Sequence, residues 1–183
     1  MTAPQTIIDF WLRHGPEAWF SRNEALDAEI AADYAELHFQ ASRNELSDWQ
    51  ETPEGTLALL LLLDQFPRNL FRGSAHSYAT DPLARTIAHH ALAKGFDQQV
   101  EPILRPFIYL PFEHSEDMED QRYSVSLFEK HRDKTGDAEA LKWAVLHLDL
   151  IERFGRFPHR NAALGRKTTP EEQAYLDEDG FKG

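Results

Sequence analysis

Apolar residues recur at helical spacing along most of the chain. In the stretch 27–43, for example, Ile30, Tyr34, Leu37 and Ala41 fall on one face of a helix. Val, Ile and Thr seldom alternate with polar residues, although such alternation is the mark of a half-buried strand. The pattern therefore predicts an all-α protein with about seven to nine helices joined by short loops.

Helix-start signals precede several of these stretches. A capping side chain, in most cases followed by proline at the first helical position, stands at Thr52-Pro53, Asp81-Pro82, Asp137 and Thr169-Pro170. The last signal continues to Glu172 and forms a capping box. Gly95 and Gly155 stand where C-terminal helix caps are expected.

Four further segments have distinct predictions. A helix is expected over 53–66, ending before Pro67, and another over 115–132 with Ser115 as its N-cap. The segment 101–112 holds three prolines, which predicts short helical turns or a bent helix. Residues 158–170 are expected to form an ordered loop against the core.

Length and composition favour one globular domain. With 183 residues, the chain is long enough to bury about 70% of its unfolded surface around a single core, so one domain over residues 1–183 is predicted. A hydrophobic fraction of 42% with 27% charged residues is typical of soluble proteins. The longest apolar run, 57–63, is far shorter than the roughly 20 residues of a membrane span. No basic region precedes the first apolar residues, so a cytoplasmic protein without a signal peptide is expected.

The charge and the absence of cysteine narrow the function classes. A formal net charge of −12 disfavours binding to nucleic acid and to anionic membranes, because phosphate contacts need a basic face. Without cysteine there can be no disulfide, no thiolate nucleophile and no zinc site with cysteine ligands. The sequence makes no prediction of oligomeric state.

Two leucine-rich segments, each predicted to end a helix, have similar sequences. Residues 59–73 read LLLLLDQFPRNLFRG, and residues 146–161 read LHLDLIERFGRFPHRN. Residues 153–170 contain no acid but hold four arginines and Lys167. One interpretation is that the two ends meet and bind a small anionic molecule or a peptide through Arg68, Asn69, Arg72, Arg156, Arg160 and Asn161.

The alternative interpretation is structural. Asp64 stands in a last helical turn, where a carboxylate faces the negative end of the helix dipole and needs a cation or donors nearby. Arginine has five donors and can satisfy buried acids and unpaired carbonyls where helices stop. On this interpretation the arginines hold the fold together and bind no ligand.

A histidine beside carboxylates is a candidate for acid–base catalysis. His114 lies next to Glu113 and close to Glu116, so His114 could act as a general acid or base with Glu116 or Glu113 orienting it, and His159 is a second candidate. A small hydrolase or transferase is therefore an alternative to a binding protein, and a protein-interaction scaffold is another. A purely structural interpretation is that the same residues cap the start of a helix. No zinc-protease motif is present, and neither a metal nor a cofactor is predicted.

Three segments carry a family resemblance: LLLLDQFPRNLFRG, YLPFEHSED (109–117), and RFGRFPHRNAALGR with TPEE (153–172). They resemble the signature segments of the bacterial domain-of-unknown-function family 924, and the resemblance covers almost the whole chain. It implies a helical array similar to tetratricopeptide-type (TPR-like) right-handed helix pairs, and it implies no activity. Where such proteins often carry His-Arg-Asp, this chain has His147-Leu148-Asp149, so any role of that arginine does not carry over.

Overall fold

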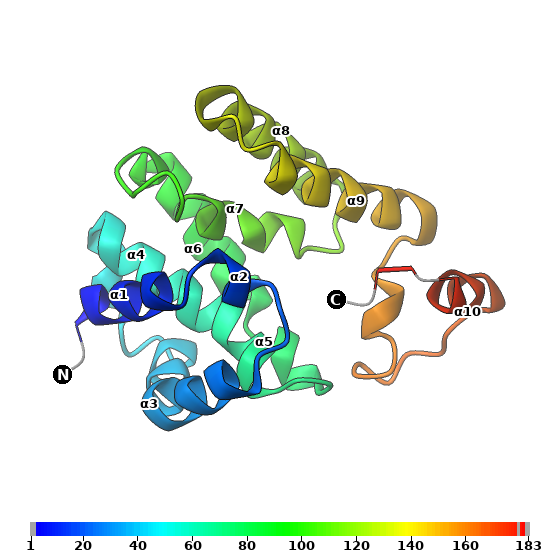
Figure 1. Cartoon of the computed structure of the whole chain (residues 1–183), viewed down its shortest axis with the longest axis horizontal. Helices are drawn as coiled ribbons and strands as arrows, with labels where there is room; N and C mark the ends of the chain where they lie inside the picture. Colours follow the sequence, from blue (N-terminus) through cyan, green and yellow to red (C-terminus); the bar gives the residue numbers. More distant parts are fainter. Residues whose placement is uncertain (1–2, 179, 182–183) are drawn as a thin grey trace. The chain divides into compact units, whose positions relative to one another are not determined.

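The structure is a computed structural model that describes residues 3–178 and 180–181. Within these residues it contains helices, turns and loops but no strand, which confirms the all-α prediction (Figure 1). None of the described helices has the length and apolar character needed to cross a membrane. The chain divides into two compact units. Unit 1 comprises Met1–Arg72 and His76–Pro111, and unit 2 comprises Gly73–Ala75 and Phe112–Gly183.

The helices of unit 1 precede those of unit 2 along the chain. In order, they are α1 (Pro4–His14), α2 (Pro16–Trp19), α3 (Glu24–Ser42), η1 (Ser47–Glu51), α4 (Pro53–Leu60), η2 (Leu61–Gln65), α5 (Phe66–Leu70), η3 (Ala75–Tyr78), α6 (Asp81–Ala93), η4 (Phe96–Gln98) and α7 (Pro106–Glu113), which continues into unit 2. Unit 2 holds α8 (Met118–Thr135), α9 (Ala138–Phe154), η5 (Pro158–Arg160) and α10 (Pro170–Asp177).

Helix α4 is the centre of unit 1. Every residue from Gly55 to Leu63 is buried, and α4 contacts α1, α6 and η1. Gly55 permits the contact with η1, because a Cβ atom at this position would lie 2.2 Å from the carbonyl oxygen of Trp49. Burial of leucines on all sides of the helix provides much of the hydrophobic stabilisation of this unit.

The prediction that this helix ends at Phe66 is wrong. The chain passes from α4 through η2, which is a short π-helix, and continues past Pro67 as α5. Proline lacks an N–H and its ring clashes with the carbonyl four residues earlier, here that of Leu63. The wider π turn, in which the N–H of Phe66 donates to the carbonyl of Leu61, accommodates the proline without ending the helix.

Side chains from other segments donate hydrogen bonds to two main-chain carbonyls of the π-helix. His38 of α3 donates from Nδ1 to the carbonyl of Leu62 at 2.8 Å, and the Thr80 hydroxyl donates to the carbonyl of Leu63 at 2.5 Å. Burial lowers the pKa of His38, and the hydrogen bond to the carbonyl only partly offsets this effect. His38 therefore serves as a neutral donor, and the local irregularity depends on tertiary contacts.

Replacing Thr80 by valine is expected to destabilise the protein by about 1 kcal/mol, because the Leu63 carbonyl loses its donor while the side-chain volume is nearly kept. Chemical denaturation followed by circular dichroism measures the change. Thr86→Val is the matched control, since the Thr86 hydroxyl donates to a carbonyl of its own helix at an exposed position. Equal effects of the two substitutions would contradict the proposed role of Thr80.

Several predicted helix caps are confirmed. The Asp137 carboxylate accepts from the N–H groups of Glu139 and Ala140, and Thr169 and Glu172 form the capping box at the start of α10. Gly155 ends α9 in the left-handed conformation with φ 68°. In unit 2, α8 and α9 lie side by side as a helical hairpin (Figure 1).

Two predicted caps are wrong in position. Asp117, not Ser115, is the N-cap of α8, and its carboxylate accepts from the N–H groups of Glu119 and Asp120. The Ser115 hydroxyl instead donates to Asp120 at 2.7 Å. The N-cap of α6 is Thr80, so Asp81 is the first helical residue and its carboxylate pairs with an arginine. Both shifts occur where a second capping residue lies within two positions of the first.

Candidate functional site

At the first of the two similar helix ends, Arg68 lies between two buried carboxylates of unit 1. Its Nη1 and Nη2 atoms donate to the two oxygens of Asp81 at 3.1 and 3.2 Å, and Nη1 lies 3.7 Å from Asp64 Oδ1. Arg68 also donates to the main-chain carbonyl of Asp64. Burial alone would lower the pKa of Arg68, but the two carboxylates outweigh it and raise the pKa. The arginine is therefore a permanent cation in the interior of unit 1.

Asn69 and Arg72 converge on one acid of α3. Asn69 Nδ2 donates to Asp27 Oδ1 at 2.7 Å, while Arg72 donates from Nε and Nη2 to the two oxygens of Asp27 at 2.6 and 2.8 Å. Burial would raise the pKa of Asp27, but these bonds and the charge of Arg72 lower it. The predicted binding residues of this helix end thus connect α3, α5 and α6, which supports the structural interpretation.

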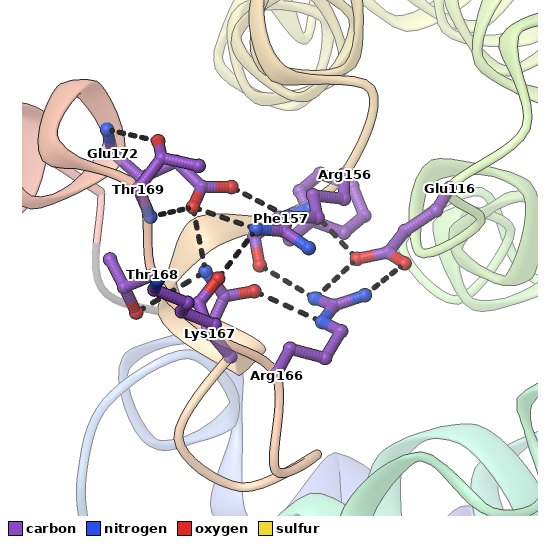
Figure 2. Close-up of polar contacts among 9 residues, drawn as sticks. Glu116, Arg156, Phe157, Arg166, Lys167, Thr168, Thr169 and Glu172 are labelled. Carbon is purple, nitrogen blue, oxygen red and sulfur yellow. Dashed lines mark hydrogen bonds and ion pairs between the residues drawn. The ribbon is translucent and has the colours of Figure 1, made fainter.

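The second helix end belongs to unit 2, where Glu116 anchors the segment after α9 (Figure 2). Arg166 donates from Nη1 and Nη2 to the two oxygens of Glu116 at 2.6 and 2.9 Å, and the N–H of Phe157 donates to Oε1 at 2.8 Å. Burial would raise the pKa of Glu116, but these hydrogen bonds and the nearby arginines lower it. Within the described residues Glu116 makes no hydrogen bond to His114, so the predicted orienting role stays a prediction.

Glu172 is the second anchor of this segment. Arg156 donates to both of its oxygens at 2.6 and 2.8 Å, and the N–H of Thr169 donates at 2.7 Å (Figure 2). Asn161 joins the two anchors, because its Nδ2 donates to Glu172 at 3.1 Å and its Oδ1 accepts from Arg166 at 3.0 Å. We call these five side chains (Glu116, Arg156, Asn161, Arg166 and Glu172) the unit 2 clamp.

A buried histidine that the sequence did not single out as catalytic lies beside an acid. His147 Nδ1 is 3.2 Å from Glu113 Oε1 and 2.9 Å from the carbonyl of Trp143. Both side chains are almost fully buried. Glu113, one of the two acids expected to orient His114, thus forms an ion pair with His147, and its role towards His114 stays a prediction. The signal for His147 was its place on the apolar face of α9, where a polar residue needs a partner.

Further rings and one guanidinium surround Phe157. The Arg160 guanidinium carbon lies 4.6 Å from the centroid of the Phe157 ring, and the ring centroids of His147 and His159 lie at 5.3 and 5.6 Å. Phe181 completes this ring cluster, which we define as His147, Phe157, His159 and Phe181. His114, the other predicted catalytic histidine, has its ring 6.3 Å from that of His147.

Metal binding finds no support in the described part of the chain. In residues 3–178 and 180–181, no group of three or more histidines and carboxylates is arranged to hold a metal ion. The ring cluster itself supplies two imidazoles, with the guanidinium of Arg160 and the carboxylate of Glu113 nearby.

The comparisons with known proteins identify the family. A family model described as "Bacterial protein of unknown function (DUF924)" matches residues 7–180. The chain belongs to the DUF924 family. The resemblance stated from three sequence segments is thereby confirmed.

A solved DUF924-like structure supports the fold. It is described as "Structure of Protein of Unknown Function ATU0120 from Agrobacterium tumefaciens", is 49% identical in sequence, and superimposes with a TM-score of 0.89. The match covers 96% of this DUF924 chain and 97% of the other chain. None of the curated proteins compared with the chain is similar to it.

Proposed function

We propose that this DUF924 protein binds a small anionic ligand at the ring cluster of unit 2. The observation that carries the proposal is the gathering of Arg160, His147 and His159 around the ring of Phe157. Arg160 is only 6% exposed, although the chain as a whole has a formal charge of −12. A buried cation attracts a carboxylate or phosphate more strongly than a cation on the surface does.

The geometry of these groups suits an anion. A guanidinium stacked on an aromatic ring keeps its planar donors in one orientation, and the imidazole of His159 carries at least one N–H donor in either protonation state. The predicted binding residues Arg156 and Asn161 belong to the clamp, so they act by positioning the turn that carries His159 and Arg160. Arg68, Asn69 and Arg72 of unit 1 are engaged with Asp27, Asp64 and Asp81, and this proposal gives them no contact with the ligand.

Replacing Arg160 by glutamine, or His159 by asparagine, is expected to weaken the binding of phosphate and citrate about tenfold or more, because the anion loses the guanidinium or the imidazole as a hydrogen-bond donor. Isothermal titration calorimetry at low salt measures the dissociation constants. Arg153→Gln is the matched control, since Arg153 is exposed and pairs with the exposed Glu171. The proposal fails if the unmodified protein binds neither anion, or if the control weakens binding as much as Arg160→Gln.

A second candidate function rests on the pair of Glu113 and His147. The Trp143 carbonyl accepts from Nδ1, and the Glu113 carboxylate lies 3.2 Å from the same nitrogen, so the proton is held there and Nε2 is the basic nitrogen. Such a pair could serve general-base catalysis in a small hydrolase or transferase. His147→Gln would then abolish hydrolysis of an active ester or phosphate ester, while His131→Gln, on the buried face of α8, would not. Loss of activity in both variants would point to a structural effect.

Three finer expectations stay predictions beside this proposal. The hairpin of α8 and α9 is the kind of helix pair from which tetratricopeptide-type arrays are built, and it supports that arrangement. A cytoplasmic location and a role as an interaction scaffold are the other two expectations, and this proposal does not depend on either.

A further inference from the structure

The ring of Phe181 occupies a place within the ring cluster. Its centroid lies 4.8 Å from that of His147 and 5.1 Å from that of His159, with the planes at 67° and 88°. The indole of Trp143 lies on a third side at 5.9 Å. Edge-to-face contacts of this kind are favourable for aromatic rings. One six-membered ring from the end of the described chain thus makes three contacts with neighbouring rings.

The backbone before Phe181 is held against α10. The Gly180 N–H donates to the carbonyl of Tyr175 at 3.1 Å, and the Phe181 N–H donates to the Tyr175 hydroxyl at 2.8 Å. A Cβ atom at Gly180 would lie 2.3 Å from the Tyr175 carbonyl oxygen and 2.6 Å from its ring. Only glycine permits this approach, so the position of Phe181 depends on the residue before it. We call Gly180 and Phe181 the C-terminal strap.

The strap is held less firmly than the rings that it covers. Phe181 is half-buried and rests on hydrogen bonds to one residue, whereas Phe157 is fully buried in the core of unit 2. Segments with few buried contacts open at lower free energy than the core does. Displacing Phe181 therefore leaves the other rings and the clamp in place.

We propose that Phe181 is an internal competitor for the aromatic ring of the ligand, and that the ligand is an aromatic acid or an aryl phosphate. This inference rests on the proposed function of the same site. A phenyl ring in the place of Phe181 would make the same contacts with His147, His159 and Trp143. Its anionic group would be directed to the donors beside Phe157, which include Arg160. The strap thereby sets how tightly the ring of such a ligand is bound.

Two variants test the inference by different routes. Phe181→Ala removes the competing ring, and Gly180→Ala keeps the ring but forces the strap away from Tyr175. Phenyl phosphate and inorganic phosphate are the probes, and isothermal titration calorimetry gives their dissociation constants. If the strap covers the cluster for about nine-tenths of the time, both variants bind phenyl phosphate about tenfold more tightly than the unmodified protein. Binding of inorganic phosphate is expected to stay the same.

The control is Phe20→Ala, which removes a highly exposed ring of unit 1 and is expected to change neither affinity. Circular dichroism spectra and melting curves establish that each variant is folded. If both strap variants are folded and bind phenyl phosphate no more tightly than the unmodified protein, the inference is wrong. Phosphate binding in all variants would then still support the proposed function. If neither probe binds to any of the proteins, both the proposed function and the inference are wrong.

Discussion

Replacing Arg68 by leucine is expected to lower the free energy of unfolding by about 3–5 kcal/mol, the range found when one partner of a buried ion pair is removed. Arg68 is the cation that Asp64 and Asp81 share, and both carboxylates are buried. The substitution also takes the side-chain donor from the main-chain carbonyl of Asp64 in the π-helix. The effect is large because the substitution leaves ionised carboxylates in a region of low dielectric without their cation, which costs more free energy than the loss of a hydrogen bond alone.

Denaturation in urea, followed by circular dichroism, measures this loss. Arg22→Leu is the control, because the ion pair of Arg22 with Glu24 is exposed on both sides and is expected to contribute less than about 1 kcal/mol. Adding Asp81→Asn to Arg68→Leu should recover part of the loss, since one buried charge is then removed. A single Arg68→Leu variant as stable as the control would show that Arg68 does not compensate these acids.

Replacing Glu172 by glutamine is expected to lower the free energy of unfolding by about 2–4 kcal/mol. The glutamine amide has one acceptor oxygen, whereas the donors around Glu172 are at present shared between two carboxylate oxygens. Arg156, Asn161 and the N–H of Thr169 all donate to this carboxylate, which is 2% exposed. The loss should appear in unfolding experiments as a lower midpoint with an unchanged slope. Glu171→Gln is the matched control, as its carboxylate pairs only with the exposed Arg153. Similar costs for the two variants would contradict the role of Glu172 in the clamp.

The same carboxylate predicts how stability depends on pH. The hydrogen bonds from Arg156 are the main cause that lowers the pKa of Glu172 from 4.5 to about 2 in the folded protein. The unfolded chain therefore takes up a proton more readily, so this contribution is complete above about pH 4.5 and is lost as the pH falls towards 2. Glu172→Gln should flatten the decline of stability over this window. Asp27 and Glu116, whose pKa values are also lowered, account for the slope that persists. An identical pH profile for the variant would contradict the assignment.

The features that sequence predicted best are those that depend on neighbouring residues. The caps at Asp137 and Thr169 and the stop at Gly155 are decided within one helical turn, and they are confirmed. The passage of the helix through Pro67 was missed, because its carbonyls are satisfied by His38 and Thr80 from other helices. Local rules describe the free-energy cost of a proline within a helix. The side chains that offset this cost here lie far from Pro67 in the sequence, so local rules cannot identify them.

The polar network shows the same division. Arg72, Arg156 and Asn161 stood out in sequence as donors near helix ends, and the structure gives each a carboxylate partner. Asp27 lies 45 residues before Arg72 and Glu116 lies 50 before Arg166, so no spacing rule could have paired them. In the sequence, His147 stood out only within the His147-Leu148-Asp149 motif. Its acid partner Glu113 lies on a separate helix, 34 residues earlier, so no local rule could have paired the two.

The irregular helix of unit 1 also bears on how the protein is made. Its leftover carbonyls take one donor from His38, which is synthesised earlier, and another from Thr80, which is synthesised later. A nascent chain that has emerged from the ribosome only as far as Leu70 carries the most apolar stretch of the protein without all of its partners. The Leu63 carbonyl therefore gains its hydroxyl donor only after Thr80, at the start of α6, has been synthesised.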